Sequence, residues 1–162
     1  MTEMKIKECV LILGFLIAAF TGVFAQGEMP ISWEYEVTRV EGNEALLVFK
    51  AQVDEGWHVY GLKSTDDDSG MGPLPTVFEF EDSELYHLKG ELKPSREAGE
   101  HYDEAFMMNV YYYEGEVEFS QLVQVRKSSS TEIVVEINYM VCDNEQCIFP
   151  DPIEYTIIID NE

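Results

Sequence analysis

Apolar and polar residues alternate with a period of two along much of the chain after residue 30. Between Trp33 and Val37 the apolar positions Trp33, Tyr35 and Val37 alternate with glutamates, and the same rhythm recurs from Glu116 to Ser120. Successive side chains of a β-strand point to opposite faces of its sheet, so this pattern predicts half-buried strands.

Further strands are predicted from the same pattern and from their content of β-branched and aromatic residues: Ala45–Val53, Trp57–Tyr60, Thr76–Phe80, Tyr86–Leu92, Met107–Tyr113, Ile133–Val141 and Ile153–Ile159. Turn-forming residues separate them at Glu41-Gly42-Asn43, Asp66–Pro75, Lys93-Pro94-Ser95, Glu114-Gly115 and Ser128-Ser129-Ser130. No window after the first 26 residues has a 3.6-residue apolar stripe with helix caps. We therefore predict an all-β fold, a two-sheet immunoglobulin-like β-sandwich.

The first residues have the composition of an export signal. Lys5 and Lys7 precede an apolar run from Cys9 to Phe20, and small residues follow up to Ala25. We predict a cleaved signal peptide over residues 1–25 and a single domain over residues 26–162. No later segment approaches the roughly 20 apolar residues that cross a bilayer, so we expect no stable membrane insertion of the mature domain.

The chain is strongly acidic, with 32 Asp and Glu against 10 Lys and Arg and a formal net charge of -22. Repulsion from phosphate groups argues against nucleic acid and anionic membrane surfaces as partners. A soluble, acidic, exported protein accounts for the charge equally well.

The chain contains two groups of residues that could suggest a metal site. The aspartates between Ser64 and Pro75 suggest calcium, but a calcium loop that began at Asp66 would need a carboxylate at its twelfth position, where the chain has Val77. We expect a solvated loop there.

The second candidate metal is copper, which suits thioether and imidazole ligands such as Met107, Met108, His58 and His101. Core packing is the expected use of the methionines. We predict no resident metal and no cofactor.

Two cysteines remain after the predicted cleavage, Cys142 and Cys147, on either side of four polar residues. A four-residue loop between two strands would make them cross-strand neighbours with Cα atoms about 4.5 to 5.5 Å apart. That distance is compatible with a disulfide. The spacing is not Cys-x-x-Cys and no helix follows, which excludes a thioredoxin-type active site.

The cysteine pair has two possible uses. If the disulfide serves only as a structural crosslink, it stabilises the fold by roughly 2 kcal/mol because the loop it closes is short, against about 5 kcal/mol for a loop of 100 residues. As a reagent, a pair at a loop tip is well placed to meet another protein's thiol. Asp143 and Glu145 should raise the pKa of the thiols, while a nearby carboxylate could act as general base. Spacing alone leaves both uses open.

Three segments resemble a known family. They are "MVCDNEQCIFP" (Met140–Pro150), "DEGWHVYGL" (Asp54–Leu62) and "HYDEAFMMNVYYYEGEVEF" (His101–Phe119). They are similar to the N-terminal periplasmic domain, or disulfide corrector domain, of the thiol:disulfide interchange protein DsbD family.

The resemblance implies an immunoglobulin-like domain in the periplasm whose cysteine pair alternates between dithiol and disulfide. It would be a component of a protein-disulfide reductase that takes electrons from a membrane-embedded relay, expected on a separate chain, and passes them to oxidised exported proteins. Thioredoxin-like periplasmic proteins are the implied partners. Cys147 would form the mixed disulfide and Cys142 would resolve it.

The family also has a cap loop of two carboxylates and a phenylalanine that covers the disulfide. The resemblance assigns these positions to Asp103, Glu104 and Phe106, with Ala105 between the acidic pair and the ring, and it places His58 and Tyr60 beside the site. An aromatic cap would shield the disulfide from small thiols, so Phe106→Ala should speed its reduction by glutathione.

The alternative from another class is a non-catalytic exported β-sandwich that binds a protein or a glycan and is clamped by a structural disulfide. The reduction potential separates the two, because structural disulfides in secreted proteins usually lie below about -300 mV.

Overall fold

The computed structural model describes residues 29–40, 42–66, 72–104, 106–126 and 130–160, and within these ranges the regular structure is entirely β. The predicted signal peptide, the centre of the Asp66–Pro75 loop and most of the Ser128-Ser129-Ser130 turn lie outside the described residues. In the ranges given, no helix has the length and apolar character needed to span a membrane.

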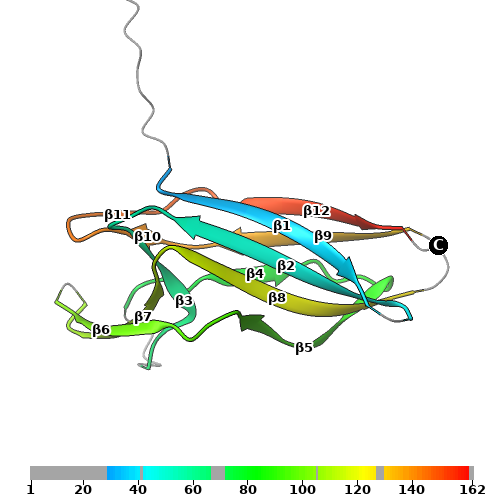
Figure 1. The fold of residues 1–162 in the computed structure, drawn as a ribbon, viewed down its shortest axis with the longest axis horizontal. Helices are drawn as coiled ribbons and strands as arrows, with labels where there is room; N and C mark the ends of the chain where they lie inside the picture. The colour runs from blue at the N-terminus through cyan, green and yellow to red at the C-terminus, as the bar shows by residue number, and fades with distance from the viewer. Residues whose placement is uncertain (1–28, 41, 67–71, 105, 127–129, 161–162) are drawn as a thin grey trace, which may run out of the picture.

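The strands form three antiparallel sheets (Figure 1). The first sheet has four strands in the order β1 (Ile31–Arg39), β2 (Glu44–Val53), β8 (Glu116–Val125) and β5 (Tyr86–Pro94). The second has five, in the order β11 (Cys147–Ile148), β10 (Val141–Cys142), β3 (His58–Thr65), β7 (Met108–Tyr113) and β6 (Gly99–Asp103). The third has three, in the order β12 (Ile153–Ile159), β9 (Thr131–Asn138) and β4 (Val77–Phe80).

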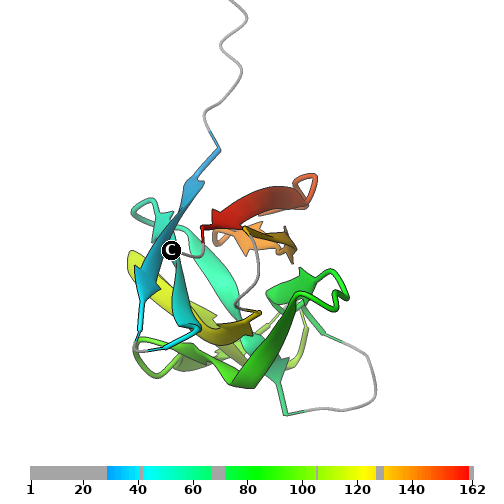
Figure 2. The ribbon, with the colours of Figure 1, turned by 90° about the vertical axis from the view of Figure 1, so that its right-hand side faces the viewer.

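The second and third sheets lie end to end, because β9 leads into β10 through Tyr139 and Met140. Figure 2, which looks along the long axis, shows the third sheet opposite the four-stranded sheet. The molecule is thus an immunoglobulin-like β-sandwich, as the alternating pattern predicts, with one of its two layers divided into two hydrogen-bonded sheets.

The core between the layers is aromatic and aliphatic. Phe49 of β2 and Phe119 of β8 are cross-strand partners, and both are fully buried. Trp33 of β1 stacks on Phe119 with ring centroids 5.9 Å apart and meets Phe78 of β4 edge-on. A fully buried aromatic side chain stabilises the fold by about 1.5–3 kcal/mol, so this cluster holds the two layers together without help from a disulfide.

The structure differs from the predicted elements in three places. The strand predicted over Ile133–Val141 is divided, because β9 ends at Asn138 and β10 begins at Val141. The segment Gly99–Asp103 has no apolar alternation, yet it forms β6 by pairing its backbone with β7. The turn predicted at Lys93-Pro94-Ser95 begins later, because β5 continues to Pro94 and the chain bends at Ser95 and Arg96. Proline lacks a backbone N–H and is tolerated there because β5 is an edge strand of its sheet.

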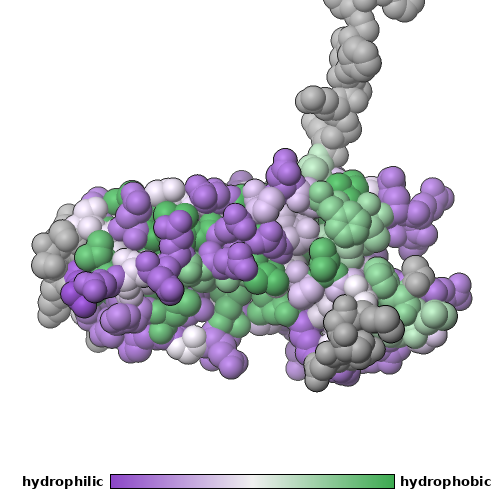
Figure 3. All heavy atoms as spheres, turned by 180° about the vertical axis from the view of Figure 1, so that it is seen from behind, coloured by the Kyte–Doolittle hydropathy of each residue, from purple (hydrophilic) through white to green (hydrophobic). Residues whose placement is uncertain are grey.

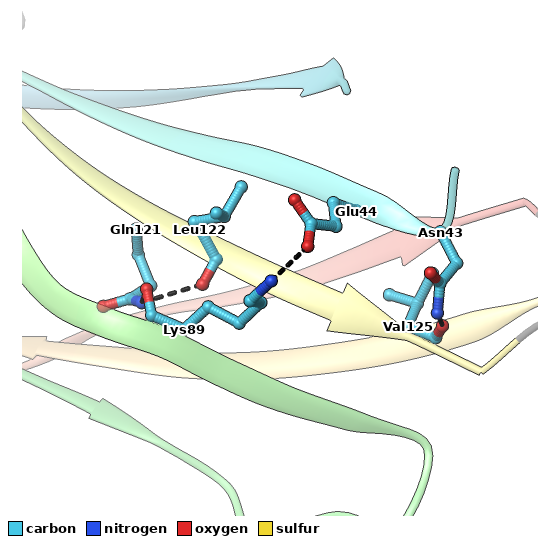
Figure 4. A network of polar contacts seen from close by, with 6 residues as sticks. All are labelled: Asn43, Glu44, Lys89, Gln121, Leu122 and Val125. Atoms are coloured by element: carbon cyan, nitrogen blue, oxygen red, sulfur yellow. Dashed lines mark hydrogen bonds and ion pairs between the residues drawn. The ribbon is translucent and has the colours of Figure 1, made fainter. Parts of the chain in front are cut away.

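Charged side chains tie strands together on the surface. Figure 4 shows Lys89 of β5 reaching across β8 to form an ion pair with Glu44 of β2, while the Asn43 side chain donates to the Val125 carbonyl at 2.6 Å. Figure 3 shows hydrophilic residues over much of one face, with hydrophobic residues between them. Large apolar residues that remain exposed include Tyr102, Met107 and Phe149.

Candidate functional site

The two cysteines lie at one end of the molecule. The tip of the β10–β11 hairpin and the β6–β7 hairpin are at the same end, the left in Figure 1, away from the C-terminus. In the five-stranded sheet β3 lies between β10 and β7, so residues at the start of β3 lie between the two hairpins. This arrangement brings together segments that are about 40 residues apart in the sequence.

Cys142 and Cys147 are direct partners in the register of β10 and β11 and form a disulfide. Their Cα atoms are 4.1 Å apart, which is shorter than the sequence analysis expects. Val141 and Ile148 form the only other rung of this short ladder within the described residues. The backbone pairing of the hairpin thus places the two sulfurs opposite each other.

The loop between the cysteines is organised by Asp143. Its carboxylate accepts hydrogen bonds from the backbone N–H groups of Glu145 at 2.7 Å and Gln146 at 2.8 Å. The Asp143 N–H in turn donates to the Gln146 carbonyl at 2.9 Å. The hydrogen bonds from the two backbone N–H groups lower the pKa of the Asp143 carboxyl, so a negative charge stays beside the disulfide.

The two cysteines have different surroundings. Cys142 is 1% exposed and belongs to a small apolar cluster with Tyr60, Val110 and Met140, whereas Cys147 is exposed. Phe106 packs against that cluster. The exposed Cys147 side of the disulfide is open to solvent, and the covering of the disulfide by Phe106 stays a prediction.

An open hollow of about 540 Å³ surrounds the disulfide. All the residues that the sequence analysis assigns to the site line it, namely Cys142, Cys147, Asp103, Glu104, Phe106, His58 and Tyr60. It is also lined by His101, Tyr102 and the four residues between the cysteines. The fold thus gathers the predicted site into one place.

Asp103 fixes the turn that carries Phe106. Its carboxylate accepts a hydrogen bond from the Phe106 N–H at 3.1 Å, and it is also hydrogen-bonded to the Tyr60 side chain. The rings of Tyr60 and Phe106 are perpendicular, with centroids 6.4 Å apart. Burial, together with the charge and hydrogen bond of Asp103, raises the pKa of Tyr60, so this hydroxyl remains a donor at neutral pH.

His58 is the cross-strand partner of Cys142 on the opposite side from Cys147. Its ring contacts those of Tyr60, His101 and Tyr112 at centroid distances of 5.1, 6.0 and 5.4 Å. Its Nε2 atom is buried and has no hydrogen-bond partner in the described part of the chain. Burial and, next, the nearby His101 lower the pKa of His58, which leaves the imidazole neutral at neutral pH.

The sequence analysis does not assign His101 and Tyr112 to the disulfide site. The Tyr112 ring lies 4.6 Å from that of His101 and covers Gly99, where an added Cβ would meet the ring at 3.1 Å. The placement of His101 beside His58 could not be predicted, because Gly99–Asp103 lacks the alternation of apolar residues that indicates a strand. Tyr113 is in the core, while Tyr111 hydrogen-bonds Asp66.

Of the residues named for copper, His58 and His101 lie together, with ring centroids 6.0 Å apart. Met107 is 76% exposed, at a backbone φ of 57°, whereas the Met108 sulfur lies beside Gly72. Across the described parts of the chain, no group of three or more His, Cys, Asp or Glu side chains is placed to hold a metal ion.

Comparison with known proteins gives a family match. The family model described as "Thiol:disulfide interchange protein DsbD, N-terminal" matches residues 30–157. No curated protein matches the chain in sequence.

Among solved structures, the N-terminal periplasmic domain of ScsB from Proteus mirabilis is similar with a TM-score of 0.54 and 13% identity. The match covers 80% of this chain and 46% of that one, so this chain spans less than half the length of the ScsB chain.

Two structures from Neisseria meningitidis are also similar. One is the DsbD N-terminal domain in the reduced form, with a TM-score of 0.48, 14% identity and coverage of 79% of this chain and 84% of that one. The other is the complex between the DsbD N-terminal and PilB N-terminal domains, with a TM-score of 0.48, 15% identity and coverage of 80% and 84%.

Proposed function

The chain belongs to the family of N-terminal domains of the thiol:disulfide interchange protein DsbD, and from this premise we propose that it exchanges disulfides with other proteins in the periplasm. Residues 1–25 would direct export, and residues 26–162 would form the working domain. Electrons would come from a membrane-embedded thiol–disulfide relay and would leave to oxidised exported proteins, with thioredoxin-like proteins among the partners.

The unequal exposure of the two cysteines is the observation that carries this proposal. Exchange proceeds by attack of a thiolate on a disulfide sulfur, which requires access to that sulfur. Both cysteines line the hollow, but Cys147 is exposed to solvent while Cys142 is buried. We assign the mixed disulfide to Cys147 and its resolution to Cys142.

The surroundings of the disulfide also suit a protein partner. The hollow is open and is bordered by Tyr102, which is 60% exposed, while Phe149, 65% exposed, follows Cys147 closely in the chain. Aromatic side chains of this kind are enriched at protein interfaces. A loop of another protein that carries a cysteine could enter from this side and reach Cys147.

A structural clamp is the competing use of the same disulfide. The aromatic core already joins the two layers, and a loop of this length contributes only about 2 kcal/mol by the chain-entropy estimate. The fold therefore has little need of this crosslink for stability.

The reduction potential of the purified domain tests the proposal. Equilibration in glutathione buffers should give a potential above about -300 mV, the region below which structural disulfides of secreted proteins usually lie. In cells, Cys142→Ala should accumulate mixed disulfides through Cys147, and these should disappear on treatment with a reductant. Cys147→Ala is the matched control and should trap far less. A reduction potential well below that limit, together with the absence of trapped proteins, would contradict the proposal and favour a purely structural disulfide.

A further inference from the structure

The step that resolves the mixed disulfide requires the Cys142 thiol to lose its proton. The nucleophile in disulfide exchange is a thiolate, so Cys142 must lose a proton before it can attack a mixed disulfide on Cys147. Cys142 is 1% exposed and packs among Tyr60, Val110 and Met140. Burial disfavours the charged thiolate and keeps bulk water away, so a neighbouring side chain must accept the proton.

Of the four carboxylates that line the hollow, Glu104 and Glu145 are exposed to solvent, whereas Asp103 and Asp143 already have hydrogen-bonding roles. Asp103 accepts the Phe106 N–H and is hydrogen-bonded to Tyr60, while Asp143 accepts two backbone N–H groups of its own loop. Protonation of either carboxylate would weaken these contacts. His58 differs from these carboxylates, because its buried Nε2 atom has no hydrogen-bond partner among the residues that the structure describes.

The position of His58 fits the task. It is the register partner of Cys142 across β3 and β10, and the side chains of such partners share one face of the sheet with Cβ atoms about 4.5–5.5 Å apart. Tyr60, two residues further along β3, lies on that face and packs in the cluster with Cys142. Buried polar atoms without partners are rare in folded proteins, and those that occur often mark a function.

We propose that His58 is the proton acceptor for Cys142 in the step that resolves the mixed disulfide, an inference that rests on the proposed function. The Cys142 thiol gives its proton to the free imidazole nitrogen. The resulting thiolate attacks the Cys147 sulfur, the Cys142–Cys147 bond forms, and the bond from Cys147 to the partner breaks. The partner leaves with the electron pair as a thiolate, which takes a proton from the imidazolium or from water.

The charges around His58 are consistent with this role. The titratable groups that face it from the neighbouring segments are Tyr60, His101, Asp103, Tyr112, Glu114 and Asp143. Burial and His101 lower the pKa of His58, and the three carboxylates oppose this shift. The imidazole is thus an unprotonated acceptor at neutral pH, and the carboxylates stabilise the imidazolium that forms when it takes a proton.

Dithiobis(nitrobenzoate) provides a test on the reduced domain without any protein partner. Cys147 should attack the reagent and release one thionitrobenzoate, and Cys142 should then release the second in a phase independent of reagent concentration. In His58→Gln the second phase should slow roughly 100-fold at neutral pH, the loss typical of a missing general base, while the first phase stays within about twofold. His87→Gln, an exposed histidine on β5, is the matched control and should leave both phases unchanged.

The wild-type protein provides a second test that does not depend on how the variant folds. Its second-phase rate should fall at low pH with a midpoint at the pKa of His58, measured by NMR in the thionitrobenzoate adduct of Cys142→Ala. An unchanged second phase in folded His58→Gln, or a wild-type midpoint unrelated to His58, would overturn the inference. Failure of Cys142→Ala to trap proteins in cells is a separate result, and it would count against the proposed function alone.

Discussion

Cys142 and Cys147 face each other across one rung of a two-residue ladder, yet Cys142 is 1% exposed and Cys147 is open to solvent. The asymmetry arises because β10 is an inner strand of the five-stranded sheet, whereas β11 is its edge. The fold thus distinguishes two chemically identical side chains by position alone.

Alkylation of the reduced protein should follow this asymmetry. In Cys142→Ala the remaining Cys147 should react with iodoacetamide at least about tenfold faster than Cys142 does in Cys147→Ala, because reaction requires an accessible sulfur. Mass spectrometry of samples quenched over time measures both rates. Equal rates in the two folded variants would contradict the assigned roles.

Phe106→Ala should expose Cys142 more than Cys147. The Phe106 ring packs on the cluster that contains Cys142, so its removal should raise the alkylation rate of Cys142 severalfold and should change that of Cys147 little. Since Phe106 is only partly buried, the loss of stability should be roughly 1 kcal/mol, below that for a fully buried phenylalanine. Reduction by glutathione, measured in parallel, tests the covering role predicted from the family.

Tyr60→Phe should change how stability depends on pH. The folded protein raises the pKa of Tyr60 above its ordinary value of 10.0, mainly through burial and then through Asp103. The unfolded chain therefore ionises first, and the Tyr60 contribution, present below pH 10.0, is lost as the pH rises through the higher folded value. Removing the hydroxyl should remove this alkaline loss.

At neutral pH the same substitution should cost about 1–2 kcal/mol, because Asp103 loses a hydrogen-bond donor. Urea unfolding on either side of pH 10.0 measures both effects. Tyr102→Phe, at a residue that is 60% exposed, is the control and should be near neutral in stability. If the two variants behave alike, the contact between Tyr60 and Asp103 has no energetic weight.

Asp143→Ala should make the disulfide easier to reduce. The carboxylate holds two backbone N–H groups of the cysteine loop, and without it the two thiols should meet less often in the reduced state. Asp143→Asn keeps an acceptor oxygen and should lie between Asp143→Ala and wild type when the three are equilibrated with glutathione.

The same contact has a dependence on pH. Backbone hydrogen bonds lower the pKa of Asp143 below its ordinary value of 3.8, so the ordering of the loop should be present above 3.8 and should be lost as the pH falls through the lower folded value. Backbone amide shifts of Glu145 and Gln146, followed by NMR, should report this transition. Shifts that do not titrate in acid would contradict the role given to the carboxylate.

The rate at which a small thiol reduces the disulfide should depend on the charge of that thiol. Four carboxylate side chains line the hollow, those of Asp103, Glu104, Asp143 and Glu145. The cationic thiol cysteamine should therefore reduce the disulfide severalfold faster than anionic mercaptopropionate, and added salt should shrink the difference through screening. Glu145→Gln should lower the preference, whereas Glu91→Gln, at an exposed position on β5, should leave it unchanged.

The alternation of apolar residues predicted most strands because one face of each is buried. In β2 the buried residues Leu47, Phe49 and Ala51 follow that period without a break. β6 could not be predicted in this way. Its residues are half-buried or exposed, and it is a strand because β7 offers its backbone a partner. Such pairing depends on the tertiary fold, which local sequence does not encode.

The disulfide site, too, was predictable only in part. The residues named from the family motifs all line one hollow. The sequence motifs could not predict which of these residues are exposed and which lie next to each other. The exposure of Cys147 follows from β11 being an edge strand, and the position of His58 opposite Cys142 follows from the register of β3 on β10.

The short ladder that joins β10 to β11 has a final implication for how partners recognise the domain. Since Val141 and Ile148 and the turn at Asp143 hold the hairpin independently of the sulfur bond, the oxidised and reduced forms should share nearly one backbone shape. A visiting protein would then find the same surface before and after electron transfer. It would distinguish the two redox states only by reacting with a sulfur atom. The difference in reduction potential between the two proteins, rather than a change of shape, would then set the direction of electron transfer.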